Sequence, residues 1–408
     1  MLIMHFIYNL GITLYGVAIA LASLFSNKAR LRYAGGRAAV DEMRRRRTPG
    51  ERYIWFHAAS LGEFEQGRAL MERLRASHPE YKIALTFFSP SGYEVRKGYA
   101  GADVVTYLPL DRPRNVRAFL DALQPEMAVF VKYEYWGNFL FSLKERGVRT
   151  YVVSAIFRPD QVFFRPYGGL FVRMLGCFTK IYVQDERSRQ LLSGVGIESV
   201  EVAGDTRFDR VADIVRRAEE LPVAAAFAGE GRPVVVAGST WPQDEELLAR
   251  FISVNKDHLR MIIVPHEVSP SRISELCSRL RCSFALYTQT TPEEAGKADC
   301  LVVDTVGILS SLYRYGRVAY VGGGFGAGIH NTLEAAVWGI PVVWGPNYHK
   351  FKEAEGLAAC GGGCAVASYR QMEDALNRLL TDSAAGASAG EYVRSKTGAT
   401  DKILAELF

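Results

Sequence analysis

The chain has 408 residues, of which 49% are hydrophobic and 23% are charged, and its formal net charge is +5 at pH 7. This is the composition of a folded globular protein; it excludes a disordered chain, and the length predicts at least two domains. So small a net charge argues against a nucleic-acid partner. The six cysteines contain no C-x-x-C pair, which indicates reduced thiols and no metal site.

Residues 1–27 contain no Asp, Glu, Lys or Arg and are mostly apolar. A helix of this length can cross a hydrocarbon layer about 30 Å thick. Positive charge follows in residues 28–50, at Lys28, Arg30, Arg32, Arg37 and Arg44 to Arg47. The positive-inside rule then leaves the rest of the chain in the cytoplasm. The pattern predicts a single N-terminal membrane anchor and a basic segment that faces anionic lipid head groups.

Two other interpretations of the apolar segment stay open. A secretory signal would carry basic residues before the apolar part, and Ala20-Leu21-Ala22 is only a weak cleavage-site mimic. Tyr8, Gly11, Tyr15 and Gly16 also suit a helix that lies in one leaflet rather than spanning the bilayer. The arginines that follow have a plainer interpretation as a solvated charge run.

Residues 51–220 alternate short apolar runs with stretches long enough for helices. The expected strands are residues 53–57, 82–87, 104–107, 127–132, 150–154, 180–183 and 200–203. This rhythm is typical of an open parallel sheet with helices on both faces, so we expect an N-terminal Rossmann-like domain over 51–220.

Three polar residues follow strands of this first domain. Glu63 begins a helix just after the first strand, where a carboxylate also has a purely structural role against the helix dipole. Glu134 stands among aromatic residues at a strand end, and Arg207 lies in a turn where it could neutralise a phosphate. An ion pair of Arg207 with Asp205 or Asp209 is the structural alternative.

A second α/β series follows a polar, Ala-rich linker that spans 211–231. Its expected strands are residues 233–237, 260–264, 283–287, 300–303, 318–321 and 341–344. We therefore expect a C-terminal Rossmann-like domain over 221–408 and an α/β fold of two doubly wound parallel sheets that face each other across a cleft. Gly238, Ser239 and Thr240 end its first strand, and Thr240 has capping-box spacing to Gln243.

Residues 317–346 form the most informative stretch. An apolar strand ends in Gly322, Gly323, Gly324, Gly326 and Gly328, and a helix is expected to open near Asn331 or Thr332. A helix N-terminus beyond a glycine turn suits a phosphate. A dinucleotide fold would place an acid at the end of the next strand, but that strand ends in Trp344-Gly345-Pro346. Glu334 lies inside the helix instead, which favours a sugar nucleotide.

These motifs together resemble the Kdo (3-deoxy-D-manno-octulosonic acid) transferases of Gram-negative bacteria, over nearly the whole chain. The resemblance rests on Ser60-Leu61-Gly62-Glu63, Glu134-Tyr135-Trp136-Gly137-Asn138, Gly204 to Asp209, Ala237-Gly238-Ser239-Thr240, Asp304-Thr305-Val306-Gly307, Val321-Gly322-Gly323 and Asn331-Thr332-Leu333-Glu334-Ala335-Ala336. It departs from the usual pattern at Gly137, at the single His266 and at Ile308.

The resemblance implies an inverting GT-B glycosyltransferase of lipopolysaccharide synthesis that needs no metal or cofactor. It would move Kdo from CMP-Kdo, a co-substrate, to a lipid A precursor (lipid IVA) at the cytoplasmic face of the inner membrane. Glu63 then matches the proton acceptor, while Glu134 and Arg207 match residues that stabilise the transition state. The expected CMP contacts are Pro265, His266, Gly307, Ile308, Leu309, Asn331, Thr332, Leu333 and Glu334. Weaker donor contacts are expected at Gly238, Ser239, Thr240, Gly322 and Gly323.

Two other functions fit the residues as well. One is a GT-B glycosyltransferase or an epimerase that uses a UDP-sugar. The other is a membrane-anchored nucleotide-binding or lipid-binding protein without activity. The sequence does not indicate how many Kdo residues are transferred. It also does not indicate the acylation and phosphorylation of the acceptor or the oligomeric state.

Overall fold

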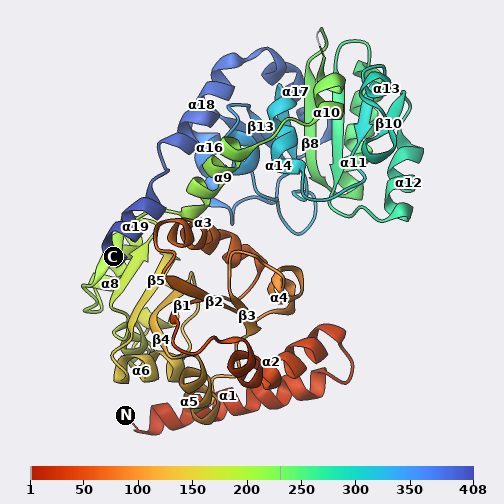
Figure 1. Cartoon of the computed structure of the whole chain (residues 1–408). Coiled ribbons are helices and arrows are strands. Elements are labelled where there is room, and N and C mark those ends of the chain that lie inside the picture. The colour runs from red at the N-terminus through yellow and green to blue at the C-terminus, as the bar shows by residue number, and fades with distance from the viewer. Residues whose placement is uncertain (1, 230) are drawn as a thin grey trace. The chain divides into compact units, whose positions relative to one another are not determined.

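The computed structural model describes residues 2–229 and 231–408, so Met1 of the expected anchor and Glu230 of the expected linker lie outside the described residues. The chain forms two compact units (Figure 1). The first comprises Met1–Arg210 and Thr397–Phe408, and the second Val211–Lys396. The boundary therefore falls at 211 rather than 221, and the last helix joins the first unit rather than the second.

The first unit contains a parallel seven-stranded sheet in the order β3-β2-β1-β4-β5-β6-β7. Its strands are β1 (Arg52–Ala58), β2 (Tyr81–Phe87), β3 (Val104–Tyr107), β4 (Pro125–Val131), β5 (Arg149–Ala155), β6 (Lys180–Val183) and β7 (Val200–Val202). Alternate residues of β1 enter opposite cores: Trp55 packs with helices of one face and Phe56 with helices of the other. Both faces are covered, which is why the strands read as continuous apolar runs.

Helices cover both faces of this sheet. They are α2 (Asn27–Arg46), α3 (Leu61–Ser77), α4 (Pro90–Arg96), α5 (Pro113–Leu123), α6 (Gly137–Glu145), α7 (Gly169–Leu175), α8 (Glu186–Ser193) and α19 (Ala399–Leu407). Helix α9 (Thr206–Arg217) contains the boundary between the two units. The C-terminal α19 is held to this unit because Asp209 accepts hydrogen bonds from Gly398 N at 2.6 Å and from Thr400 N at 2.7 Å. Ile403 and Leu407 of α19 are buried in the same core as Phe56.

The N-terminal helix α1 (Leu2–Ala22) is, among the described residues, the one helix long and apolar enough to cross a membrane. One of its faces docks on the first unit. Tyr8 donates a hydrogen bond to Asp111 at 2.6 Å, Asn9 accepts one from Asn138 at 2.8 Å, and Tyr15 stacks on Phe88. The opposite face exposes Ile3, Phe6, Ile7, Leu10, Leu14, Val17 and Leu21.

The second unit contains another parallel seven-stranded sheet, in the order β10-β11-β9-β8-β12-β13-β14. Its strands are β8 (Val234–Thr240), β9 (Arg260–Pro265), β10 (Phe284–Leu286), β11 (Cys300–Val302), β12 (Val318–Val321), β13 (Val342–Trp344) and β14 (Gly363–Ala365). The predicted α/β class and six of these strands are confirmed. The edge strand β14 was not predicted, because its glycines have low strand propensity.

The helices of the second unit follow the same alternation. They are α10 (Pro222–Ala228), α11 (Pro242–Asn255), α12 (Pro270–Arg279), α13 (Pro292–Ala295), α14 (Leu309–Leu312), α15 (Leu333–Ala336), α16 (Lys352–Ala359), α17 (Tyr369–Thr381) and α18 (Ser383–Arg394). A core on one face of the sheet joins β8, β9 and β12 to α11, α12 and α17.

Candidate functional site

In each sheet one pair of neighbouring strands forms a switch point of the strand order, and several predicted site residues lie at the ends of these strands. In the first unit β1 lies beside β4, and in the second β8 lies beside β12. Ligands of open α/β sheets bind beyond the carboxyl ends of the strands at such a switch point. Glu63 and Glu134 follow β1 and β4, while Thr240 is the last residue of β8 and Gly322 follows β12.

Glu63 is held by the start of its own helix. Its Oε2 accepts hydrogen bonds from Ser60 N at 2.8 Å and from Ser60 Oγ at 2.7 Å, which closes a capping box at α3. Glu63 therefore has the structural role at the helix start that the sequence suggested. Among the described residues, nothing donates a hydrogen bond to Oε1 of Glu63, and the side chain is half-buried. This oxygen is oriented by the cap and is left available as an acceptor.

Glu134 is buried and receives two hydrogen bonds. His57 Nε2 lies 2.9 Å from Oε2 of Glu134, and Trp136 Nε1 donates to the same oxygen at 2.6 Å. Analysis of the sequence did not single out His57, which is the sixth residue of β1 and fully buried. A histidine inside an otherwise apolar buried strand is the signal that could have identified it.

Thr86 on the neighbouring strand β2 orients His57. The Nδ1 atom of His57 lies 2.8 Å from Thr86 Oγ1 and 3.1 Å from Thr86 O, while Trp55 Nε1 donates to Thr86 Oγ1 at 2.8 Å. Either the threonine hydroxyl donates to Nδ1 of a neutral ring, or a doubly protonated ring donates to the carbonyl oxygen. An ionised carboxylate can only accept a hydrogen bond, so the contact with Glu134 is a hydrogen bond when Nε2 carries a proton.

Arg207 forms an ion pair with Asp205. This pairing is one of the structural alternatives that the sequence left open. Its Nε and Nη2 atoms donate to Oδ2 of Asp205 at 2.9 and 2.8 Å. Burial alone would raise the pKa of Asp205, but the Arg207 charge and hydrogen bonds from Arg207 and Gln66 outweigh it and lower that pKa. Arg207 keeps a quarter of its side chain exposed.

Tyr133 connects the neighbourhoods of Glu63 and Arg207. Burial raises the pKa of its hydroxyl, the positive charges of Arg158 and Arg207 oppose the rise, and the negative charge of Glu63 adds to it. These residues therefore lie within electrostatic range of one ring. The preceding residue, Lys132, has a φ of 66°, a backbone conformation that non-glycine residues rarely adopt and that is often found at functional sites.

In the second unit, the glycines serve close packing more than anion binding. Gly322 and Gly323 are buried; Gly322 N donates to Gly238 O at 2.9 Å, and Gly323 N donates to Asp244 Oδ2 at 2.9 Å. A Cβ on Gly322 would lie 2.4 Å from Ser239 O, and one on Gly238 would lie 2.1 Å from the Tyr313 hydroxyl. Gly322 and Gly323, both predicted to contact the donor, thus donate their backbone N–H groups to other groups of the protein.

The helix expected after the glycine turn is shorter than its sequence suggests. It is α15, a single turn of four residues, so its dipole can contribute little. Asn331 holds its start, since Oδ1 accepts from Leu333 N at 3.1 Å and Nδ2 donates to Glu334 Oε1 at 3.0 Å. Thr332 is fully buried, and its hydroxyl has no hydrogen-bond partner among the described residues.

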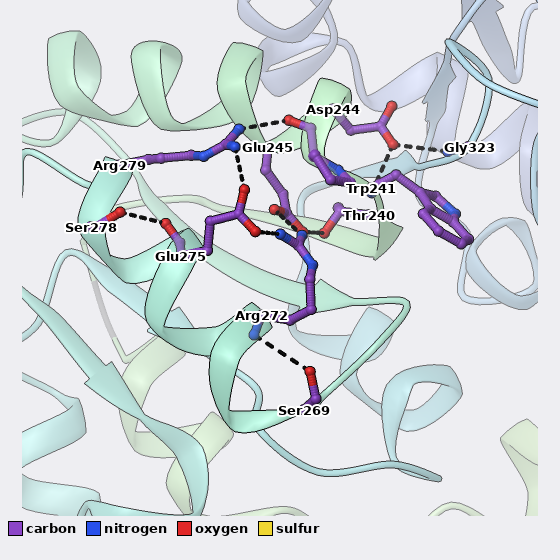
Figure 2. Close-up of polar contacts among 11 residues, drawn as sticks. Thr240, Trp241, Asp244, Glu245, Ser269, Arg272, Glu275, Ser278, Arg279 and Gly323 are labelled. Atoms are coloured by element: carbon purple, nitrogen blue, oxygen red, sulfur yellow. Dashed lines mark hydrogen bonds and ion pairs between the residues drawn. The ribbon is translucent and has the colours of Figure 1, made fainter.

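A polar network fixes the segment after β8 (Figure 2). Thr240 Oγ1 donates to Glu245 Oε1 at 3.2 Å, and Arg272 Nη2 on α12 donates to Glu245 Oε2 at 2.6 Å. The predicted capping box between Thr240 and Gln243 is wrong, because α11 starts one residue later. Asp244 caps it instead, accepting from Trp241 N at 2.9 Å. In Figure 2 the Trp241 ring extends away from Arg272.

Three aromatic rings stack beside this network. The ring of His266 lies 4.6 Å from the Trp241 ring and 4.5 Å from the His330 ring, and both pairs are nearly parallel. Trp241 Nε1 donates to His330 Nε2 at 3.1 Å. Burial, with a smaller contribution from the charge of His266, lowers the pKa of His330 to about 4, so its ring is neutral at pH 7. Sequence analysis identified His266 but not its two stacking partners.

Two of the remaining predicted nucleotide residues, Leu309 and Glu334, lie near Tyr313. Leu309 begins α14, and its side chain and the Tyr313 hydroxyl both approach Gly238. The negative charge of Glu334 also acts on Tyr313. Pro265 is buried at the end of β9, whereas Gly307 is exposed with a φ of 92°, and Ile308 follows it as the cap of α14. Leu309 and the Tyr313 hydroxyl thus lie near Gly238, and Glu334 lies within electrostatic range of Tyr313. Within residues 2–229 and 231–408, no group of three or more metal-ligating side chains is found.

Comparison with solved structures defines the class of protein. A UDP-GlcNAc 2-epimerase from Neisseria meningitidis, bound to UDP-GlcNAc, matches with a TM-score of 0.62 and 12% identity, covering 87% of this chain and 99% of that chain. CalG4, a calicheamicin glycosyltransferase, matches with a TM-score of 0.54 and 12% identity, covering 88% and 98%. With two parallel α/β sheets and these neighbours, the chain has the GT-B fold.

Sequence comparison defines the family. Residues 29–210 match the family model described as 3-Deoxy-D-manno-octulosonic-acid transferase (kdotransferase). The chain is 29% identical over 335 residues to the 3-deoxy-D-manno-octulosonic acid transferase of Aquifex aeolicus, an alignment that covers 80% of this chain and 86% of the relative. The chain is therefore an enzyme that is similar to the Kdo transferases over most of its length, and residues 29–210 match the model of that family.

Proposed function

We propose that this enzyme moves Kdo from CMP-Kdo to a hydroxyl of a lipid A precursor, lipid IVA, with inversion at the anomeric carbon and without a metal ion. The observation that carries the proposal is the state of Glu63. One carboxylate oxygen is held by Ser60, and the other accepts no hydrogen bond from any described residue. A carboxylate so oriented suits the acceptance of one proton.

The reaction is a single displacement. The acceptor hydroxyl oxygen forms a bond to the anomeric carbon of Kdo as the bond from that carbon to the CMP phosphate oxygen breaks. The bonding electrons leave with CMP, and the hydroxyl proton passes to Oε1 of Glu63. Because the transition state resembles an oxocarbenium ion, proton transfer is late and a weakly basic carboxylate suffices.

Two side chains, Arg207 and Glu134, stabilise the charges that develop in the transition state. Arg207 meets negative charge on the donor with the exposed part of its guanidinium. Glu134, held by His57 and Trp136, places a negative charge where positive charge develops on the sugar ring. On the nucleotide side, we assign the stack of Trp241, His266 and His330 and the segments at Leu309 and Glu334 to CMP.

The test is a transfer assay on Glu63→Gln with CMP-Kdo and the lipid acceptor, in which products are identified by mass spectrometry. The proposal requires that the variant folds, binds CMP and loses transfer. Turnover close to wild type would remove Glu63 from the mechanism. The same assay counts the Kdo residues that are added.

A UDP-sugar enzyme is the competing assignment, because an epimerase bound to UDP-GlcNAc shares the fold. We expect CMP to raise the melting temperature of the protein more than UDP does. A larger shift with UDP would favour the competing assignment.

For location, we propose the cytoplasmic face of the inner membrane. The apolar face of α1 exposes side chains such as Phe6, Leu14 and Leu21, at 68%, 61% and 59%. Membrane contact would remove them from water. Flotation of the full chain with vesicles, compared with a Leu14→Glu, Leu21→Glu variant, tests this; equal flotation would contradict it.

A further inference from the structure

Arg32 of α2 is buried without an acidic partner. It is 6% exposed, and its Nε and Nη2 atoms have no hydrogen-bond partner among the described residues. The guanidinium lies 4.0 Å above the Phe88 ring, and burial lowers its pKa to about 10, with only Tyr15 and Tyr107 acting in the opposite direction. A buried charge without a counter-ion is unfavourable, and buried charges in proteins are usually paired.

A cavity of about 410 Å³ opens at this arginine, between α1, α2 and the segment that joins β3 to α5. Its lining carries two further arginines, Arg37 and Arg112, and the polar side chains of Tyr33 and Asn115. No carboxylate of the described residues lines it. The volume lies within the range of small-molecule sites, which is roughly 300–1,000 Å³.

Neither of the other two arginines is neutralised at the cavity. Arg112 donates only a long hydrogen bond of 3.4 Å, to the Thr13 carbonyl, and its buried Nε has no partner among the described residues. Arg37 is exposed and donates to the Tyr33 hydroxyl at 3.1 Å. The nearest acid in sequence, Asp111, is committed to other donors, including Asn138 N at 3.0 Å and Phe139 N at 3.0 Å. The cavity is therefore a site of uncompensated positive charge.

A second cavity, of about 480 Å³, shares Ile19 and Arg32 with the first. Its lining is mostly apolar, with Ala18, Ala22 and Phe88 among the contacts. Both cavities adjoin α1, which lies beside α2 (Figure 1) and exposes its apolar residues on the opposite side. A ligand that fills both must carry an anion and a hydrocarbon part.

We propose that Arg32, Arg37 and Arg112 bind the phosphate group of a membrane lipid whose hydrocarbon lies along α1. Guanidinium groups bind phosphate oxygens with paired, charge-assisted hydrogen bonds, and the buried Arg32 gains the counter-ion it lacks. Two sources carry this chemistry: an anionic phospholipid of the bilayer and the phosphate of the lipid acceptor. The site itself does not depend on the transfer reaction proposed above.

The test measures binding of dihexanoyl phosphatidic acid to the full chain in detergent by calorimetry. Dihexanoyl phosphatidylcholine and inorganic phosphate are the comparison ligands. We expect the wild type to bind phosphatidic acid at least tenfold more tightly than either. Arg32→Gln should weaken that binding at least tenfold, and Arg112→Gln should weaken it as well if Arg32→Gln does not fold. Arg30→Gln, on the exposed side of α2, is the matched control and should change it less than twofold.

Equal binding of phosphatidic acid by Arg32→Gln and wild type would overturn the proposal. So would equal loss in Arg30→Gln, or inorganic phosphate binding as tightly as the lipid. The source is decided by transfer kinetics. If the acceptor supplies the phosphate, Arg32→Gln raises KM for the phosphorylated acceptor only. If the bilayer supplies it, KM is unchanged while flotation with phosphatidic acid vesicles falls; both results support the site.

Discussion

Nε2 of His57 lies 2.9 Å from Oε2 of Glu134, which joins the strand β1 to the segment that follows β4. The contact joins a fully buried histidine to a carboxylate at the switch point between β1 and β4. Thr86 contacts the other ring nitrogen, Nδ1, at 2.8 Å, so both nitrogens of His57 have polar partners. Glu134 is thereby held by a fully buried residue of the first unit.

His57 and Glu134 should be energetically coupled. His57→Phe removes a donor from a buried carboxylate, and a buried acceptor left unsatisfied costs about 1–3 kcal/mol. We expect a coupling of about 1–3 kcal/mol in a double-mutant cycle with Glu134→Leu, measured by chemical unfolding. Additive effects of the two changes would show that the contact has no energetic role.

Glu63→Gln should separate chemistry from folding. The glutamine keeps an oxygen that can accept from Ser60, so the cap of α3 survives, but it cannot accept a proton. The transfer rate should fall by about 10³-fold at unchanged melting temperature and CMP affinity. Glu72→Gln, farther along α3, is the control and should retain activity.

Arg207 should show separable structural and catalytic roles. Arg207→Ala leaves the buried Asp205 unpaired and should cost on the order of 3 kcal/mol in unfolding free energy as well as activity. Adding Asp205→Asn should restore stability but not transfer, because the charge that meets the donor is still missing. Recovery of transfer in the double variant would contradict a catalytic role for Arg207. Arg207→Lys keeps the charge and should remain active.

The packing of the glycine turn can be tested at two positions. Gly322→Ala places a Cβ 2.4 Å from Ser239 O and 2.7 Å from Thr240 Cα, so it should destabilise the second unit by about 1–3 kcal/mol. Gly326→Ala meets nothing closer than 3.6 Å and should be tolerated. Thermal unfolding of both variants distinguishes them, and equal melting temperatures would show that the turn rearranges freely.

His330 should make stability depend on pH. Its folded-state pKa of about 4 lies below the ordinary value of 6.5. Between these values the unfolded chain binds a proton that the folded chain does not, so stability falls as pH drops from about 6.5 to 4. The melting temperature should fall less over this range in His330→Gln than in the wild type. The exposed His258→Gln serves as control, and parallel profiles for wild type and His330→Gln would contradict the prediction.

Much of the fold follows from local pattern. The runs 104–107, 180–183 and 318–321 were predicted as strands with the bounds that the structure has, because strands buried on both faces are continuous apolar runs. The position of Glu63 at a helix start could also be predicted, because the capping box involves only Ser60 and Glu63, which are three positions apart. Local chemistry was enough for these features.

The partners of the site residues required the tertiary structure. The chain alone did not show that Arg207 pairs with Asp205 while Asp209 holds α19, nor that Asp244 uses the N–H of Gly323. The burial of Arg32 could not be predicted either, because Arg32 lies in a sequence segment with many basic residues. Strand and helix types are encoded by the periodic alternation of neighbours in sequence, whereas a polar group's partner is chosen by the packing of segments far apart in the chain, which no local pattern records.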